Sequence, residues 1–121
     1  DICTMNCGIR VRIDPYPAAL QREWARMDDL WNDGLTRFGG PFLAGETFTA
    51  VDAFFAPVAF RVQTYEPPLS ARSREYVNRL LALPSMQAWY LAALSEPWRD
   101  EGQEEEAHRA GAWLQDLRHV R

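Results

Sequence analysis

The sequence predicts an all-α fold, a bundle of five to six helices, and three observations favour it. Apolar residues recur at spacings of three and four along most of the 121 residues, which is the period of a helix with one buried face. Pro and Gly clusters interrupt these runs, as expected of short links between helices. No segment shows a convincing alternation of apolar and polar residues, so we expect no strands. The length suits one domain over residues 1–121, with 100–121 as a C-terminal extension.

The first part of the chain predicts two helices separated by the sequence DPYP. Residues 1–12 are interpreted as the last turns of a helix, because the prolines of DPYP end any helix there. The next helix is predicted over residues 17–38, and Gly39 and Gly40 end it through their freedom to adopt left-handed backbone angles. Its apolar residues form one stripe: Leu20, Trp24, Met27, Leu30, Trp31, Leu35 and Phe38.

A third helix is predicted from Ala50 to Tyr65, and it is the central one. Thr49 and Asp52 have the spacing of a capping box, in which each side chain binds the other residue's backbone N–H. The helix is apolar nearly all round, which predicts burial on most sides. Pro57 removes one hydrogen bond inside the helix, so we expect a kink there.

Three more helices are predicted in the C-terminal half, over residues 70–83, 84–95 and 104–117. Trp89 and Trp113 fall at core-like positions of the last two, as Trp24 and Trp31 do earlier in the chain. The acidic stretch that begins at Asp100 is interpreted as solvated, because consecutive carboxylates point around a helix rather than converging.

Composition and charge exclude several functions. The net charge is −4 and the pI is about 5.1, which argues against nucleic acid as a partner. No apolar stretch approaches the roughly 20 residues of a membrane-spanning helix, so we expect no membrane partner. Cys3 and Cys7 lie four residues apart, on one face of the predicted first helix, and are interpreted as free thiols in a reducing compartment.

The sequence offers no convincing set of catalytic or metal-binding residues. It has no Gly-rich phosphate loop and no Ser/His/Asp arrangement. His108 and His119 lie in the charged C-terminal region, where exposure is expected. Asp52 is better explained as a helix cap than as a catalytic carboxylate. A zinc site would need about four ligands, and two cysteines do not supply them. We therefore expect no catalytic residue and no metal in this chain.

Two segments resemble the C-terminal helical domain of glutathione S-transferases, in a style that looks bacterial. The first, GPFLAGETFTAVDAFFAPVAFRV, is similar to the family signature that leads into the central helix. The second, YVNRLLALPSMQAWYLAALSEPW, resembles the next two helices. The resemblance covers about residues 1–99, and the signature matches fall at Phe42, Leu43, Gly45, Phe48, Thr49 and Asp52.

The resemblance implies that the catalytic machinery lies outside this sequence. Family members carry an N-terminal thioredoxin-like domain that binds most of glutathione and supplies the Tyr, Ser or Cys that activates its thiol. This chain would begin at Asp1 within the first helix of the C-terminal domain, a helix that lines the hydrophobic substrate pocket and the dimer interface. Candidate substrate-binding residues are then Met5, Asn6 and Arg10 at the end of that helix, with Ile9 beside them, and Phe60 and Tyr65 on the central helix. For Phe60 and Tyr65, core packing is the favoured interpretation.

Two functions remain open after this reasoning. The first is the substrate-site and dimerisation domain of a cytoplasmic, homodimeric enzyme that conjugates glutathione to hydrophobic electrophiles; this chain alone would be inactive. The second is a non-catalytic interaction or scaffold module of the same fold. The reading frame immediately upstream distinguishes them, because the enzyme requires a thioredoxin-like domain there. Either way, apolar surface left uncovered predicts association.

Overall fold

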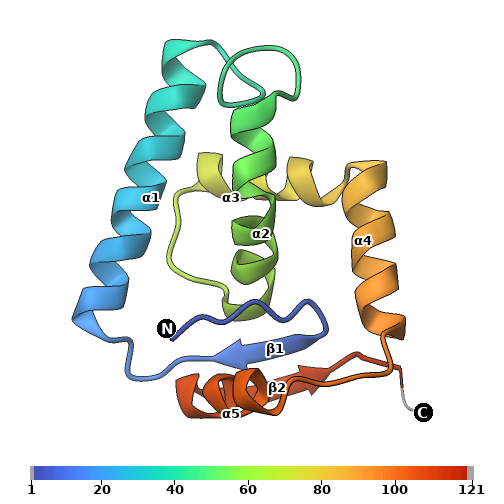
Figure 1. Ribbon diagram of the computed structural model, residues 1–121. Helices are drawn as coiled ribbons and strands as arrows, with labels where there is room; N and C mark the ends of the chain where they lie inside the picture. The colour runs from blue at the N-terminus through green and yellow to red at the C-terminus, as the bar shows by residue number, and fades with distance from the viewer. Residues whose placement is uncertain (1, 120–121) are drawn as a thin grey trace.

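The computed structural model describes residues 2–119 and shows a helical domain closed at one end by a small sheet. Figure 1 shows α1 and α4 on either side of α2, with α3 crossing them and the sheet and α5 lying together across one end. The all-α bundle is confirmed. Its elements are β1 (Ile9–Arg12), α1 (Ala18–Arg37), α2 (Ala50–Tyr65), α3 (Ala71–Leu81), α4 (Pro84–Ser95), α5 (Glu101–Ala110) and β2 (Ala112–Asp116).

The two ends of the chain differ from the prediction. The described part of residues 1–12 is extended and contains β1, not the end of a helix; Asp1 lies outside the described residues. The last predicted helix, over 104–117, is also wrong, because α5 ends at Ala110 and β2 follows. β1 and β2 form a two-stranded antiparallel sheet with an irregular register between Arg10 and Val11.

The sequence of β1 explains why it is a strand. Ile9, Val11 and Ile13 are buried while Arg12 is exposed, so the segment alternates with a period of two. β-branched residues with this alternation fit a half-buried strand. The extended conformation also separates the two cysteines. Cys7 is buried and Cys3 partly buried, both as free thiols, and they do not share a helix face.

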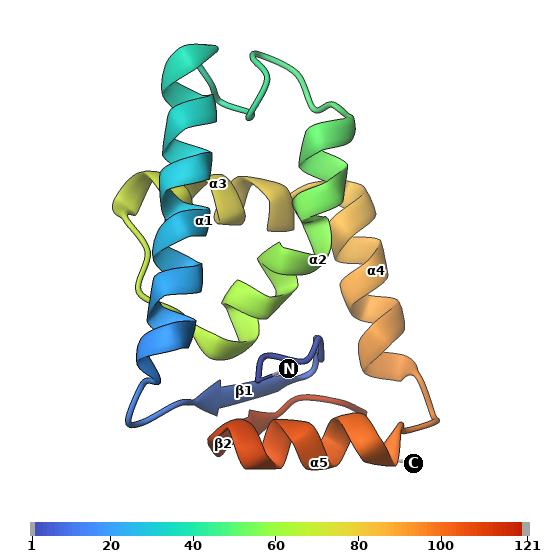
Figure 2. The ribbon, with the colours of Figure 1, turned by 60° about the vertical axis from the view of Figure 1, so that its left-hand side comes forward.

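α2 has the predicted bounds and lies at the centre of the fold. It contacts both α3 and β1, and its buried residues include Ala59, Phe60 and Val62. Figure 2 shows α2 changing direction part-way along, as expected from Pro57 within it. The expected burial on nearly all sides is wrong at the first turns, where Phe54 is 81% exposed.

The tryptophans divide between core and surface. Trp31 is fully buried and makes edge-to-face contacts with Phe55 and Tyr76. Trp24 is also buried, as predicted. Trp89 is 40% exposed, so its predicted core position is wrong. Trp113 is half-buried and stacks on His108 at 3.9 Å between ring centres.

Asp52 is a buried anchor that joins three parts of the fold. Its Oδ2 accepts the Thr49 N–H at 2.9 Å and a weaker bond from the Thr49 hydroxyl at 3.4 Å. Its Oδ1 accepts the Leu43 N–H at 3.1 Å and the Tyr76 hydroxyl at 2.7 Å. Burial first, and then this bond to Asp52, raise the pKa of Tyr76. Asp52 therefore ties the loop before α2 and the middle of α3 to the start of α2.

None of the helices within residues 2–119 combines the length and apolar character needed to cross a membrane.

Candidate functional site

The candidate site is a cavity of about 240 Å³ where the N-terminal segment meets the end of α4 and the start of α5. Met5 and Asn6, both predicted substrate-binding residues, line it. Trp89 and Ala93 reach it from α4, and Trp98 from the link that follows. We call this cavity the Trp98 pocket. Its wall joins residues 5–8 to residues 89–104, which are far apart in the sequence, with Arg118 beside them, so the pocket exists only in the folded chain.

Two tryptophans give the Trp98 pocket its aromatic surface. Trp98 is 68% exposed, and its indole N–H donates to the Glu96 carboxylate at 2.7 Å. Trp89 is held from behind by Phe60, in an edge-to-face contact with ring centres 4.9 Å apart. Both indoles are thus fixed by neighbours and still keep exposed surface. Such surface binds flat apolar or aromatic molecules well.

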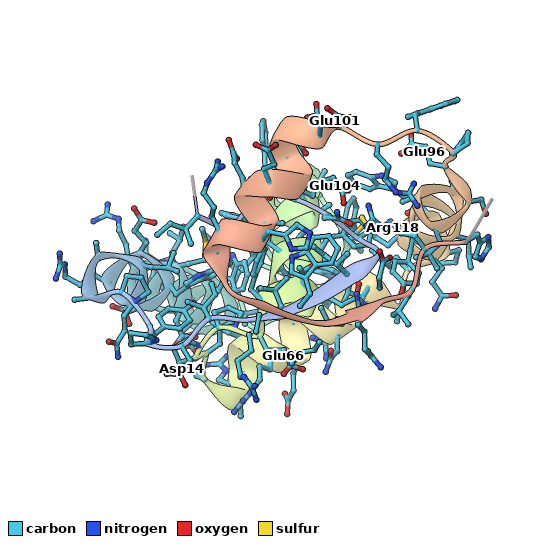
Figure 3. The ribbon with its side chains drawn as sticks, turned by 90° about the horizontal axis from the view of Figure 1, so that it is seen from below. Asp14, Glu66, Glu96, Glu101, Glu104 and Arg118 are labelled. Carbon is cyan, nitrogen blue, oxygen red and sulfur yellow. The ribbon has the colours of Figure 1, made fainter. Side chains whose placement is uncertain are left out.

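The charged side chains that line the pocket already have hydrogen-bond partners within the described chain. Arg118 forms ion pairs with Glu104 and with Asp116, the latter at 2.7 Å. Figure 3 shows Glu104 on α5 and Arg118 near one another beside this helix, with Glu96 at the end of α4. The hydrogen bond to Asp116 is the main cause that raises the pKa of Arg118. Asp100 caps α5 by accepting the Gln103 N–H at 3.0 Å.

Arg99 is the cation at the pocket whose side chain binds no other charged group in the described chain. Its guanidinium donates to the backbone carbonyls of Glu96 and Trp98, at 3.0 and 3.3 Å. Within residues 2–119 it forms no ion pair. The side-chain oxygen of Asn6 is already bound, because its Oδ1 accepts the Gly8 N–H at 3.1 Å. Arg99 can therefore meet a polar substituent of a molecule that lies on the indoles.

The other predicted substrate-binding residues lie elsewhere. Tyr65 is buried, and its hydroxyl donates to the Thr4 carbonyl at 2.7 Å. Phe60 is 1% exposed and supports Trp89 from the core. Arg10 faces a different cavity, and Ile9 is fully buried. The structure thus brings Met5 and Asn6 together in the Trp98 pocket. The other predicted residues are either buried in the core or, like Arg10, line another cavity.

The sequence reasoning missed Trp98 and Arg99. A signal was present, because Trp98 follows Pro97 and so lies outside any helix. A large aromatic residue on a link between helices has less chance of core burial than one on a helix stripe, and this favours a surface role.

The described residues offer no activated nucleophile at the pocket. Burial raises the pKa of Cys7 to about 11, although the Arg10 charge opposes this. Burial also raises the pKa of Cys3. A raised pKa disfavours the thiolate, which is the nucleophilic form of a cysteine. His108 and His119 are exposed, and residues 2–119 contain no group of three potential metal ligands.

Fold and site together define an all-α domain with a small aromatic pocket. The family model for the glutathione S-transferase C-terminal domain matches residues 16–92, more than half of the chain. The chain therefore belongs to this domain family. The match includes α1, α2, α3 and most of α4, and thus the Trp89 side of the pocket. Comparisons with curated proteins and with solved structures gave no match.

Proposed function

We propose that this chain is the substrate-site domain of a glutathione S-transferase-like enzyme that conjugates glutathione to hydrophobic electrophiles. The observation that supports it most is the Trp98 pocket, where Met5, Trp89 and Trp98 offer apolar and aromatic surface to a small molecule. An electron-poor aromatic ring would lie against these indoles, since offset and edge-to-face contacts between aromatic rings are favourable.

The pocket suits the electrophile better than glutathione. A flexible, charged tripeptide needs several free donors and acceptors, whereas Arg118, Glu104 and Asp100 are already bound to one another or to backbone. We therefore assign the Trp98 pocket to the electrophile and not to glutathione. In this proposal it is the co-substrate of the parent protein, held by a thioredoxin-like domain that this sequence does not include.

The chain positions one reactant and leaves activation of the thiol to the other domain. Holding two reactants side by side lowers the entropic cost of their reaction. Neither cysteine is placed to replace the missing activating group, because Cys7 is only 5% exposed and Cys3 does not line the pocket. We therefore expect no transferase activity from the 121 residues alone. We also propose that the parent enzyme is cytoplasmic and bacterial.

A direct binding experiment tests the proposal. We expect 1-chloro-2,4-dinitrobenzene to bind the chain in isothermal titration calorimetry, and Trp98→Ala to weaken this binding by roughly three- to tenfold, because an aromatic contact contributes about 0.5–1.5 kcal/mol. The matched control is Leu114→Ala, another exposed apolar residue, which lies on β2 outside the pocket. Equal effects of the two substitutions, or no binding, would reject the pocket as a substrate site.

A second candidate function is a non-catalytic interaction module of the same fold. The observation that favours it is exposed apolar surface away from the Trp98 pocket, with Phe54 at 81% and Leu30 at 53%. Surface of this kind is typical of protein contacts, and it also fits homodimerisation or contact with the thioredoxin-like domain. Under this alternative, light scattering would show association while the dinitrobenzene titration gave no heat.

A further inference from the structure

A second cavity, of about 510 Å³, lies between β1, the end of α2 and α3. It shares no lining residue with the Trp98 pocket and plays no part in the proposed function. Its polar lining consists of Arg10, Gln63, Glu66, Arg74 and Asn78. We call it the Arg10–Arg74 pocket. It combines two guanidinium groups with one carboxylate, which makes it a polar site rather than an apolar groove.

Arg10 is a pre-positioned cation in this pocket. Its guanidinium donates to the carbonyls of Cys7 and Ile9, at 3.0 and 2.9 Å, and to the Tyr90 hydroxyl at 3.1 Å. A guanidinium has five N–H groups, so these three bonds leave two free. The three bonds fix the side chain, and binding a carboxylate to a fixed guanidinium costs less side-chain entropy than ordering a mobile one.

Arg74 supplies the second cation of the pocket. It projects from α3 and is exposed. Its backbone N–H donates to the Ser70 carbonyl at 3.0 Å, but its side chain forms no hydrogen bond and no ion pair within residues 2–119, so its whole guanidinium fork is available. Arginine forks bind carboxylates in a bidentate manner. Two carboxylates can therefore be bound here, one by each arginine.

The other side of the pocket favours a positive group. Glu66 caps α2 with left-handed backbone angles, φ 43° and ψ 58°. Left-handed angles are unfavourable for a residue with a side chain and are found disproportionately at functional sites. The carboxyl end of a helix also attracts cations. Gln63, one turn earlier, has a side-chain carbonyl without a hydrogen-bond partner in the described chain.

We propose that the Arg10–Arg74 pocket binds a small amino acid with an acidic side chain. Arg10 and Arg74 bind its two carboxylates, and Glu66 and the Gln63 amide receive its ammonium group. The charges match, since two arginines and one glutamate sum to +1 and such an amino acid carries −1. A plain anion would satisfy the arginines and would be repelled by Glu66, so the ammonium group distinguishes this ligand.

The test is isothermal titration calorimetry of the chain with L-glutamate as the probe. We expect saturable binding, and glutarate, which lacks the ammonium group, to bind at least tenfold more weakly. Arg74→Gln should weaken L-glutamate binding at least tenfold, because hydrogen bonds between charged groups contribute about 1.5–3 kcal/mol. The matched control is Arg72→Gln on the same helix, since Arg72 is exposed and donates to Thr36 instead. It should change the affinity less than twofold.

A second variant tests the ammonium site separately. Glu66→Gln removes the partner of the ammonium group and the repulsion of anions, so the preference for L-glutamate over glutarate should fall at least fivefold. The proposal is overturned if L-glutamate gives no saturable heat, if inorganic phosphate or glutarate binds as tightly, or if Arg72→Gln weakens binding as much as Arg74→Gln. None of these results depends on whether dinitrobenzene binds the Trp98 pocket.

Discussion

At the scale of single residues, Asp52 shows how one buried carboxylate organises this domain. It receives backbone N–H groups from Leu43 and Thr49 and the hydroxyl of Tyr76. A buried carboxylate is costly unless its oxygens are hydrogen-bonded, and Asp52 has donors on both. The sequence predicted the partner three residues away, because capping has a fixed spacing. It could not predict Tyr76, because that contact depends on how α3 packs against α2.

Loss of the Tyr76 hydroxyl should therefore destabilise the fold. We expect Tyr76→Phe to lower the free energy of unfolding by about 1.5–3 kcal/mol, because a charged acceptor loses its buried donor. Urea unfolding measures this change. The matched control is Tyr16→Phe, since the Tyr16 hydroxyl is buried without a hydrogen-bond partner in the described residues. If the control costs as much as Tyr76→Phe, the Asp52 bond is not the cause.

At the scale of elements, α1 is tied to the start of α3 by Asp28. Its Oδ1 accepts the Ser70 hydroxyl at 2.8 Å and the Asn32 amide at 3.1 Å. Ser70 in turn caps α3 by accepting the Ser73 N–H at 3.3 Å. Burial alone would raise the pKa of Asp28, but the hydrogen bonds from Ser73, Ser70 and Asn32 outweigh it and lower the pKa.

This tie predicts a pH dependence with a definite sign. The folded pKa of Asp28 lies below its ordinary value of 3.8, so its stabilisation is complete above that value. It is lost as the pH falls through the folded pKa. Asp28→Asn should cost about 2 kcal/mol at pH 7 and progressively less below about pH 4. Thermal melts across this range measure the difference. A cost that did not shrink in acid, or one matched by exposed Asp29→Asn, would contradict the assignment.

The β1–β2 sheet depends on a close approach at Gly111. A Cβ at Gly111 would collide with the backbone carbonyl of Arg12. Since backbone cannot move aside as a side chain can, Gly111→Ala should destabilise by about 1–3 kcal/mol. It should also speed hydrogen exchange at the Leu117 N–H, which donates to the Gly8 carbonyl at 2.6 Å.

Gly102→Ala is the control for this prediction. Gly102 lies within α5, and a Cβ there would meet only an oxygen of Asp100 at 3.4 Å. Alanine in an exposed helical position should stabilise the chain by roughly 0.5–1 kcal/mol. If Gly111→Ala were as harmless as Gly102→Ala, the close packing of the two strands would be wrong.

At the scale of the whole molecule, the sequence predicted the helices α1 to α4 but not the strands β1 and β2 near the two ends of the chain. The bounds of α1 and α2 could be read from apolar spacing and from Pro and Gly, which are local signals. The sheet joins Ile9 to Asp116 across almost the whole chain, and four or five residues carry too little pattern to predict such a pairing. The alternation in β1 was visible but was interpreted as the end of a helix.

The candidate site follows the same division. Met5 and Asn6 came from the family resemblance, and the structure places both in the Trp98 pocket. Trp98 and Arg99 join them only because α5 and β2 fold back beside the N-terminal segment. The Arg118 side chain lies so close to Gly8 that a Cβ at Gly8 would clash with it. A site built from both ends of a chain is therefore hard to predict from local motifs.

The proposed function requires the Trp98 pocket to hold the electrophile. Chemical-shift mapping tests it most directly, using backbone amides and indole N–H signals of this 13.9 kDa chain during titration with 1-chloro-2,4-dinitrobenzene. We expect the largest changes at Met5, Asn6, Trp89 and Trp98, and no change at Trp31 in the core. Changes centred on the exposed surface around Phe54, or no changes at all, would contradict it.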